Sequence, residues 1–107
     1  FPLSKANITV GRKTGNDICL SLDPRISRFH AQLTHREDGR WEIEDLESAN
    51  GTFVGQRRIH APTVIHPNDR FRMGRTWMLL HDDTPSVSQA RAVESVQLAE
   101  VGSEELE

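Results

Sequence analysis

Short segments in which apolar and polar residues alternate recur along the first 80 positions of this sequence, with turn residues between them. In the segment 41–44 the period of two places Trp41 and Ile43 on one face and the two glutamates on the other. No segment before Pro85 combines a helical period with capping residues. Many short strands at close spacing predict an all-β fold, a β-sandwich of two antiparallel sheets. The expected strands are 8–10, 18–20, 31–36, 41–44, 52–54, 57–59, 71–73 and 76–80.

Turn residues indicate how some of these strands are connected. Glu37, Asp38 and Gly39 form a hairpin signal between two expected strands. Gly55 followed by Gln56 suits a two-residue hairpin with a type II′ turn, because glycine readily adopts the positive φ that its first position needs. Both connections join neighbours in an antiparallel sheet.

With 107 residues and a net charge of −3, the chain has room for one domain. The tail carries one arginine against five glutamates, whereas residues 1–83 have a net charge of +1. We therefore expect a β-sandwich domain over residues 1–83 and an acidic tail or linker over residues 84–107. No run approaches the roughly 18 apolar residues of a membrane span. The lone Cys19 excludes an intramolecular disulfide, and no signal peptide is recognisable, so we expect a cytoplasmic protein.

Three polar segments stand at the ends of expected strands. They are 11–12 (Gly-Arg), 27–30 (Ser-Arg-Phe-His) and 48–53 (Ser-Ala-Asn-Gly-Thr-Phe). Arginine offers a planar fork of donors that matches phosphate oxygens, serine offers a hydroxyl donor, and asparagine has an amide that both donates and accepts. Together with Lys13 and Arg25, these segments form a compact basic region that suits one small anion better than a long polyanion.

This ordered set of segments resembles the forkhead-associated (FHA) domain, a module that binds phosphothreonine. The resemblance spans residues 3–80. It implies an FHA-like sandwich with the binding loops at one end, and a partner protein phosphorylated on threonine by an upstream Ser/Thr kinase. It implies no catalytic activity, no cofactor, no metal, and neither a nucleic-acid nor a membrane partner.

The resemblance also assigns a role to each residue of the motif. Arg12, Ser27 and Arg28 are expected to hold the phosphate, and Asn50 is expected to grip the main chain of the bound peptide. His30 is expected to tie the loops together by hydrogen bonds rather than to act on a ligand. The residues expected to shape the loops are Gly11, His30, Ala49, Gly51 and Thr52.

The sequence departs from the family pattern at three points. Ala49 stands where many members carry a side chain that forms hydrogen bonds, and this change is expected to reshape recognition. Val54 and Gly55 shorten the usual Val-Asn-Gly, and Asn68 and Asp69 stand in place of Gly-Asp. The last two changes are turn variants remote from the phosphate.

The first strand of the family would precede Phe1, where this sequence begins. Its partner would be the strand 76–80, which is apolar on both faces and would otherwise leave a hydrophobic edge. Two alternatives stay open: residues 95–98 pair with that strand, or the natural protein has more residues before Phe1 and the tail is a solvated linker. Thr84 is also a candidate phosphorylation site, whose phosphate would compete for Arg12.

Other functions compete with phosphothreonine binding. A phosphate-independent interaction domain would keep the sandwich and use a face outside the loops around Arg12. A hydrolase would use Ser27, His30 and Asp45, but the sequence has no Gly-x-Ser-x-Gly elbow. The acidic net charge does not favour nucleic-acid binding. Zinc-site spacing is absent from the scattered histidines, which are His30, His35, His60, His66 and His81.

Overall fold

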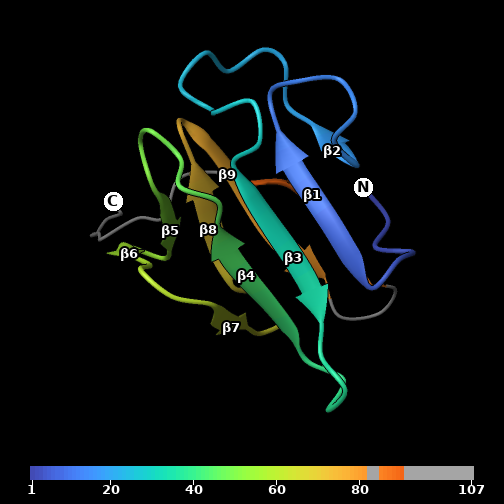
Figure 1. Ribbon diagram of the computed structural model, residues 1–107. Coiled ribbons are helices and arrows are strands. Elements are labelled where there is room, and N and C mark those ends of the chain that lie inside the picture. Colours follow the sequence, from blue (N-terminus) through green and yellow to red (C-terminus); the bar gives the residue numbers. More distant parts are fainter. Residues whose placement is uncertain (82–84, 91–107) are drawn as a thin grey trace, which may run out of the picture.

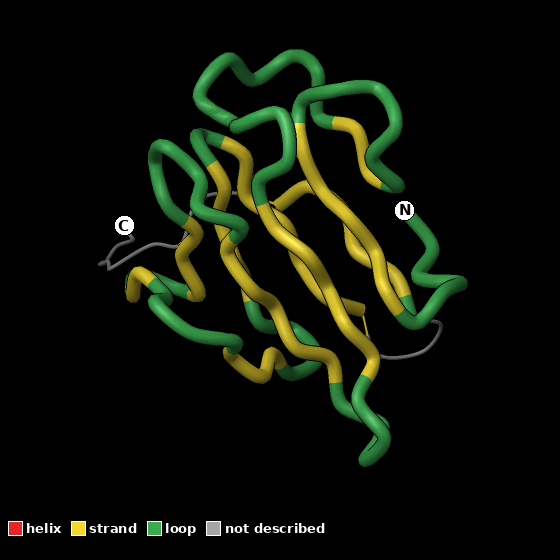
Figure 2. The backbone as a smooth tube through the Cα atoms, in the orientation of Figure 1, coloured by secondary structure: helices red, strands yellow, loops and turns green. Residues whose placement is uncertain are grey.

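The computed structural model describes residues 1–81 and 85–90. The regular secondary structure of these residues consists of β-strands alone. The strands form two five-stranded sheets that pack face to face (Figure 1; Figure 2). Since the described residues contain no helix, they contain none long and apolar enough to cross a bilayer. The expected all-β sandwich is confirmed.

The first sheet has the strand order β2-β1-β3-β4-β7. Its strands are β1 (Asn7–Gly11), β2 (Ile18–Cys19), β3 (Ala31–His35), β4 (Trp41–Asp45) and β7 (Thr63–Ile65). Neighbouring strands are antiparallel except β1 and β2, which run parallel. The predicted hairpin between β3 and β4 turns at Gly39, whose φ is 88°.

The second sheet has the order β10-β9-β8-β5-β6 and is antiparallel throughout. Its strands are β5 (Thr52–Val54), β6 (Arg57–Arg58), β8 (Arg70–Met73), β9 (Thr76–His81) and β10 (Ser86–Ala90). The predicted two-residue hairpin joins β5 to β6, because Val54 pairs with Arg57. Gly55 has a φ of 60°, which fits the first position of a type II′ turn.

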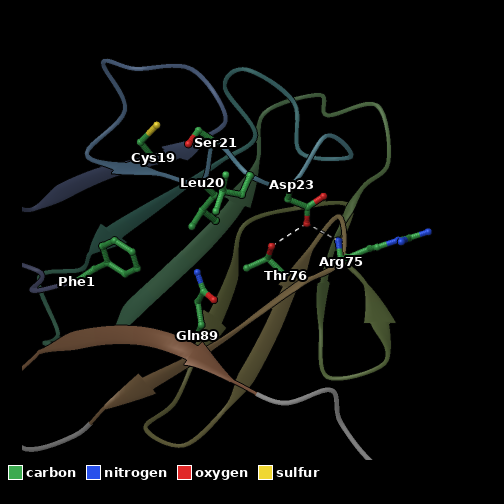
Figure 3. Close-up of a pocket in the computed structure, with 9 residues that line it drawn as sticks. Phe1, Cys19, Leu20, Ser21, Asp23, Arg75, Thr76 and Gln89 are labelled. Carbon is green, nitrogen blue, oxygen red and sulfur yellow. Dashed lines mark hydrogen bonds between the residues drawn. The ribbon is translucent and has the colours of Figure 1, made fainter.

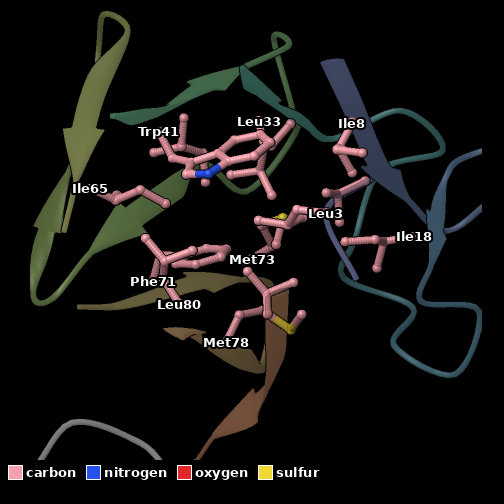
Figure 4. Close-up of a cluster of buried hydrophobic side chains, with 14 of the residues drawn as sticks. Leu3, Ile8, Ile18, Leu33, Trp41, Ile65, Phe71, Met73, Met78 and Leu80 are labelled. Atoms are coloured by element: carbon pink, nitrogen blue, oxygen red, sulfur yellow. The ribbon is translucent and has the colours of Figure 1, made fainter. Parts of the chain in front are cut away.

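The core lies between the sheets and consists of the inward-facing residues of both (Figure 4). Leu33 and Ile43 from the first sheet and Phe71 and Met78 from the second have no exposed surface. Fully burying one such side chain stabilises the fold by about 1.5–3 kcal/mol, so the period of two in the sequence decides which face of each strand turns inward. The remaining buried apolar residues are Leu3, Ile8, Val10, Ile18, Leu20, Ile26, Ala31, Trp41, Ile59, Ile65, Met73, Leu80 and Val87.

The outer edge of β9 is covered by β10, and this pairing corrects our expectation for the tail. The covering strand is residues 86–90, within the segment that we took for a tail or linker. The sheet therefore extends past the expected domain boundary at residue 83. Phe1 adds to the edge, since its amino group donates to the carbonyl of Val87 and its carbonyl accepts from the Val87 amide, both at 2.9 Å. Thr84 and residues 91–107, which include 95–98, lie outside the described residues.

Three loops gather at one end of the sandwich, at the top of Figure 1. They comprise residues 12–17 after β1, residues 20–30 after β2, and residues 46–51 after β4. We call these three loops the loop cluster. They contain most of the polar positions that the sequence analysis selected, and the strands hold the loop ends in place.

Candidate functional site

Gly11 ends β1 and allows the loop 20–30 to pack directly against the strand. A Cβ atom on Gly11 would lie 2.1 Å from the carbonyl oxygen of Arg28 and 2.8 Å from Nδ2 of Asn16, which is closer than non-bonded atoms approach. Gly11 is therefore needed for space rather than for an unusual backbone conformation. The residue after it, Arg12, starts from a fixed strand end.

Arg12 is exposed, and hydrogen bonds to loop 20–30 hold both its main chain and its side chain. Its main-chain amide donates to the carbonyl of Ser27 at 3.0 Å, and its Nε donates to the carbonyl of Ile26 at 2.9 Å. The hydrogen bond from Nε orients the guanidinium, while no bond within the described residues uses the two terminal nitrogens. Arg12 thus presents an oriented pair of donors to solvent, which is the arrangement that a phosphate oxygen pair requires.

Ser27 connects two loops of the cluster. Its Oγ accepts a hydrogen bond from the Ala49 amide at 3.0 Å, so the hydroxyl hydrogen stays available to donate. Arg28 follows with an exposed side chain, and its carbonyl accepts from the amide of Lys13 at 3.3 Å. The Ser27 hydroxyl and the main chain of Arg28 are therefore positioned by hydrogen bonds from loops 46–51 and 12–17.

His30 is fully buried beneath the loops. Its Nδ1 accepts the amide hydrogen of Ser27 at 3.0 Å, and its Nε2 lies 2.8 Å from the carbonyl oxygen of Gly51. Because an amide only donates and a carbonyl only accepts, the ring is neutral with its hydrogen on Nε2. Burial lowers the pKa of His30 below its usual value, and the hydrogen bond to Gly51 and the charge of Asp45 offset only part of this effect. His30 joins loop 20–30 to loop 46–51.

Asn50 and Gly51 form the tip and the end of loop 46–51. The exposed Asn50 donates from Nδ2 to the carbonyl of Arg25 at 2.7 Å, which ties this loop to the preceding one. Gly51 has a φ of 87°, a conformation that other residues rarely adopt, and Glu47 at the start of the loop has a φ of 56°. No hydrogen bond among the described residues uses the Oδ1 of the exposed Asn50, so the side chain keeps the capacity to read a peptide main chain.

Asp45 accepts hydrogen bonds from loop 46–51 and from the start of β5. It accepts hydrogen bonds from the amide and the hydroxyl of Ser48, and from the Thr52 hydroxyl at 2.7 Å. Burial raises the pKa of Asp45, but the hydrogen bonds from Ser48 and Thr52 outweigh burial and hold the pKa below its usual value. The carboxylate and the fully buried Thr52 thereby fix the start of β5, which directly follows Asn50 and Gly51 in the chain.

Two buried residues of the cluster were missed by the sequence analysis, and Asn16 is the first. Its Nδ2 donates to the carbonyls of Lys13 and Arg28, both at 2.8 Å, and so joins loop 12–17 to loop 20–30. Its Oδ1 is buried without a hydrogen-bond partner among the described residues. The only signal in the sequence was a turn-forming asparagine after Gly15.

Asp23 is the second missed residue, and it anchors loop 20–30 to the turn between β8 and β9 (Figure 3). Its carboxylate accepts from the amides of Arg25 at 3.0 Å and Arg75 at 2.8 Å, and from the Thr76 hydroxyl at 2.7 Å. Burial raises the pKa of Asp23, but these hydrogen bonds outweigh it, so the pKa lies below its usual value. In the sequence, a carboxylate before Pro24 signals only a turn. The contacts of Asp23 with Arg75 and Thr76 span more than 50 positions and leave no local signal.

Positive charge collects on the exposed surface of the cluster. Arg12, Lys13, Arg25 and Arg28 are all exposed, and none pairs with a carboxylate within the described residues. Lys13 lies 5.7 Å from the centre of the Phe29 ring, which is itself 48% exposed. Four cations without carboxylate partners and one hydroxyl with an available hydrogen give the loop cluster the chemistry that a small dianion requires.

The residues of a possible hydrolase triad come close together but do not form a triad. The ring of His30 bonds to the amide of Ser27 and not to its hydroxyl. Asp45 lies 4.0 Å from Nε2 of His30, beyond hydrogen-bond distance, and that nitrogen is engaged with Gly51. The geometry is that of a structural histidine rather than a general base, which must reach the hydroxyl that it activates.

Several known proteins resemble this chain in sequence and in fold. A family model described as "FHA domain" matches residues 8–74. The chain is 36% identical over 75 residues to the oxoglutarate dehydrogenase inhibitor of Corynebacterium diphtheriae, covering 70% of this chain and 50% of that protein. The crystal structure of the FHA domain of CT664 from Chlamydia trachomatis matches with a TM-score of 0.72 and 37% identity, covering 77% of this chain and 83% of that one.

A further solved structure contains a bound ligand. It is the N-terminal FHA domain of Rad53p from S. cerevisiae in complex with a phosphothreonine peptide, with a TM-score of 0.59 and 27% identity. The match covers 64% of this chain and 56% of that one. The chain spans about half or less of the length of the curated relatives it matches, so the likeness concerns one part of each of those proteins.

Proposed function

This chain belongs to the FHA family, whose model matches residues 8–74, and we propose that it binds phosphothreonine on partner proteins in kinase-dependent signalling. The observation that carries the proposal is the exposed group of unpaired cations around the Ser27 hydroxyl, at the end of the sandwich where Asn50 also lies. The partner is a protein with a phosphorylated threonine, written by an upstream Ser/Thr kinase.

Each exposed residue has a role that its surroundings support. The terminal nitrogens of Arg12 and the hydroxyl of Ser27 donate to phosphate oxygens, and Arg28 adds positive charge. Asn50 exchanges its bond to the carbonyl of Arg25 for bonds to the ligand main chain. Beneath these groups, His30 and Asp45 hold the loops in place and do not contact the ligand.

We infer a binding role rather than a catalytic one for the same residues. FHA domains are protein-interaction modules, and the ring of His30 is engaged with two main-chain groups. No group of three metal-ligating side chains occurs in the part of the chain that the structure describes. We place the protein in the cytoplasm, where its kinase would act and where the lone Cys19 would stay reduced.

Phosphothreonine should bind more tightly than phosphoserine, because the threonine methyl adds a small buried apolar contact and restricts the side-chain rotamers. One buried methyl group is worth roughly 0.8 kcal/mol, which corresponds to about a fourfold difference in affinity. A matched pair of peptides that bind equally well would contradict this part of the proposal.

An oriented peptide library tests the proposed function directly. The library is synthesised three times, with phosphothreonine, phosphoserine or threonine at the fixed position, and each version is titrated against the full chain. We expect selective retention from the phosphothreonine library and none from the threonine library. Equal retention from both libraries would replace the proposal with a phosphate-independent interaction domain.

A further inference from the structure

The outer face of the second sheet carries a row of cationic and aromatic side chains that the proposed phosphothreonine site does not use. Cross-strand pairing places Arg58 beside Phe53, Phe53 beside Arg72, and Arg72 beside Trp77. The guanidinium carbon of Arg72 lies 4.0 Å from the centre of the Phe53 ring and 5.7 Å from the centre of the Trp77 ring. Arg72 is therefore held between two aromatic rings.

A second row lies two residues along on β8 and β9, where Arg70 pairs with Leu79. Because Phe71 and Met78 are fully buried on the inner side, the alternation of the strands turns Arg70 and Leu79 outward. Arg70 is exposed, whereas Leu79 is half-buried. We call this surface the cation–aromatic face, and it consists of Phe53, Arg58, Arg70, Arg72, Trp77 and Leu79.

No arginine of this face forms an ion pair within the described residues, although Arg58 lines a hollow that Asp45 and Glu47 also line. The ion pairs found there involve Lys5, His30 and Arg36, and none involves an arginine of the face. The outward positions of β5, β6, β8, β9 and β10 contain no aspartate or glutamate. Arg72 donates only to the carbonyl of Gly74, at 2.7 Å, among the described groups. The exposed Arg58 and Arg70 thus remain available to carboxylates from outside, whereas Arg72 is half-buried between the rings.

The face continues from the proposed phosphothreonine site. A Cβ atom on Gly51 would lie 2.7 Å from Nε of Arg58, so the guanidinium of Arg58 packs against the end of loop 46–51. From Arg58 the row crosses β5 and β8 to Trp77 on β9. A partner bound at the loops would have this surface directly beside it.

The composition of the face specifies the chemistry of its ligand. Arginine and tryptophan are the residue types that contribute most at protein interfaces, and guanidinium groups form paired hydrogen bonds with carboxylates. Phe53, Trp77 and Leu79 provide apolar surface between the cations. We propose that the cation–aromatic face is a second binding surface, which takes a carboxylate-rich and partly apolar segment of a partner protein and does not require phosphate.

A titration followed by NMR tests this proposal on the full chain. The probe is an unphosphorylated synthetic peptide in which glutamate alternates with leucine, and its control has lysine in place of glutamate. We expect the acidic peptide to shift the indole signal of Trp77 and the amides of Phe53 and Arg72. The indole of the core residue Trp41 and the amide of Arg12 serve as internal references that should not move. No shift at millimolar acidic peptide would overturn the proposal.

Charge-reversal variants then locate the binding. Arg58→Glu combined with Arg70→Glu should lower the affinity for the acidic peptide at least tenfold, because two exposed cations of the face become anions. Arg40→Glu lies in the exposed hairpin of the other sheet and should change the affinity less than twofold. Equal weakening by Arg40→Glu would show that only net charge matters. Thermal unfolding confirms that each variant is folded.

Two other occupants give distinct results and would each overturn the proposal. If the acidic tail of this chain fills the face, Glu94→Gln with Glu100→Gln and Glu104→Gln will shift the Trp77 indole in the free protein. If a second copy fills it, that signal will depend on protein concentration. Arg12→Ala should leave this titration unchanged but weaken retention of the phosphothreonine library, so the failure of either proposal is separable from the failure of the other.

Discussion

Two layers of the loop cluster use polar side chains in opposite ways. In the exposed layer, Arg12 and Arg28 carry charge without a partner among the described residues. In the buried layer, His30 and Asp45 are satisfied by hydrogen bonds from neighbouring loops. Affinity and stability therefore depend on different residues. Changes in the buried layer should destabilise the loops, whereas changes in the exposed layer should weaken only the binding of the ligand.

The largest expected effect is at the base of the buried layer, in Gly11→Ala. The added methyl would lie 2.1 Å from the carbonyl oxygen of Arg28, and a main-chain atom cannot turn away as a flexible side chain can. We expect a loss of about 3 kcal/mol in the free energy of unfolding, at the upper end of overpacking effects. Chemical denaturation measures it. Wild-type stability in this variant would show that loop 20–30 is not packed as described.

His30→Ala should have the next largest effect. The change removes a fully buried ring and leaves the Ser27 amide and the Gly51 carbonyl without partners. Each unsatisfied buried group costs about 1–3 kcal/mol, so we expect a total loss of about 2–3 kcal/mol after partial relaxation. Binding of a phosphothreonine peptide should also fall. A variant that keeps wild-type stability but fails to bind would contradict this structural role of His30.

Arg12→Ala tests the exposed layer, where affinity should fall while stability is kept. A charge-assisted hydrogen bond is worth about 1.5–3 kcal/mol, so affinity for a phosphothreonine peptide should fall about tenfold or more. Stability should change by less than about 0.5 kcal/mol, as for most surface substitutions. Arg12→Lys should also bind weakly, because an ammonium group cannot donate as a planar fork. Calorimetry with wild-type affinity in either variant would remove Arg12 from the site.

The smallest effect is a dependence of stability on pH through His30. Burial depresses the pKa of His30 below 6.5, so the unfolded chain binds a proton more readily than the folded protein does. Stability is therefore fully present above the unfolded pKa and falls as the pH drops below it, by at most about 1.4 kcal/mol per pH unit. Denaturation at about pH 7.5 and about pH 5.5 measures this loss.

The matched control for the pH experiment is His30→Gln, which is less stable but has no imidazole to titrate. Asp23 and Asp45 do not interfere in this range, because their lowered pKa values cause loss of stability only as the pH falls through the ordinary carboxyl value of 3.8. We expect the difference between the two pH values to shrink in the variant. An undiminished difference would place the titrating group elsewhere.

The strands were predictable where burial on one face imposes a period of two, as in 41–44 and 71–73. Two strands were missed. Thr63–Ile65 is a short β-branched run between prolines, so its signal was present but brief. Ser86–Ala90 combines small and polar residues with one buried valine, and it forms a strand because β9 offers an edge that must be covered.

The candidate site was predictable only in its exposed layer. The spaced segments around Arg12, Ser27 and Asn50 follow strand ends, so a β-sandwich brings them to one end of the molecule. The buried layer depends on contacts between distant residues. Asn16 bonds to a carbonyl 12 positions away and Asp23 to an amide 52 positions away, and no local pattern indicates either contact.

One measurement tests the division of the two layers most directly: a ¹H–¹⁵N NMR titration of the full chain with one peptide in its phosphothreonine and threonine forms. The account predicts that only the phosphorylated peptide shifts the amides of Arg12, Ser27, Arg28 and Asn50, while the amide of the buried His30 moves little. Equal shifts from both peptides, or shifts confined to residues outside the loop cluster, would contradict it.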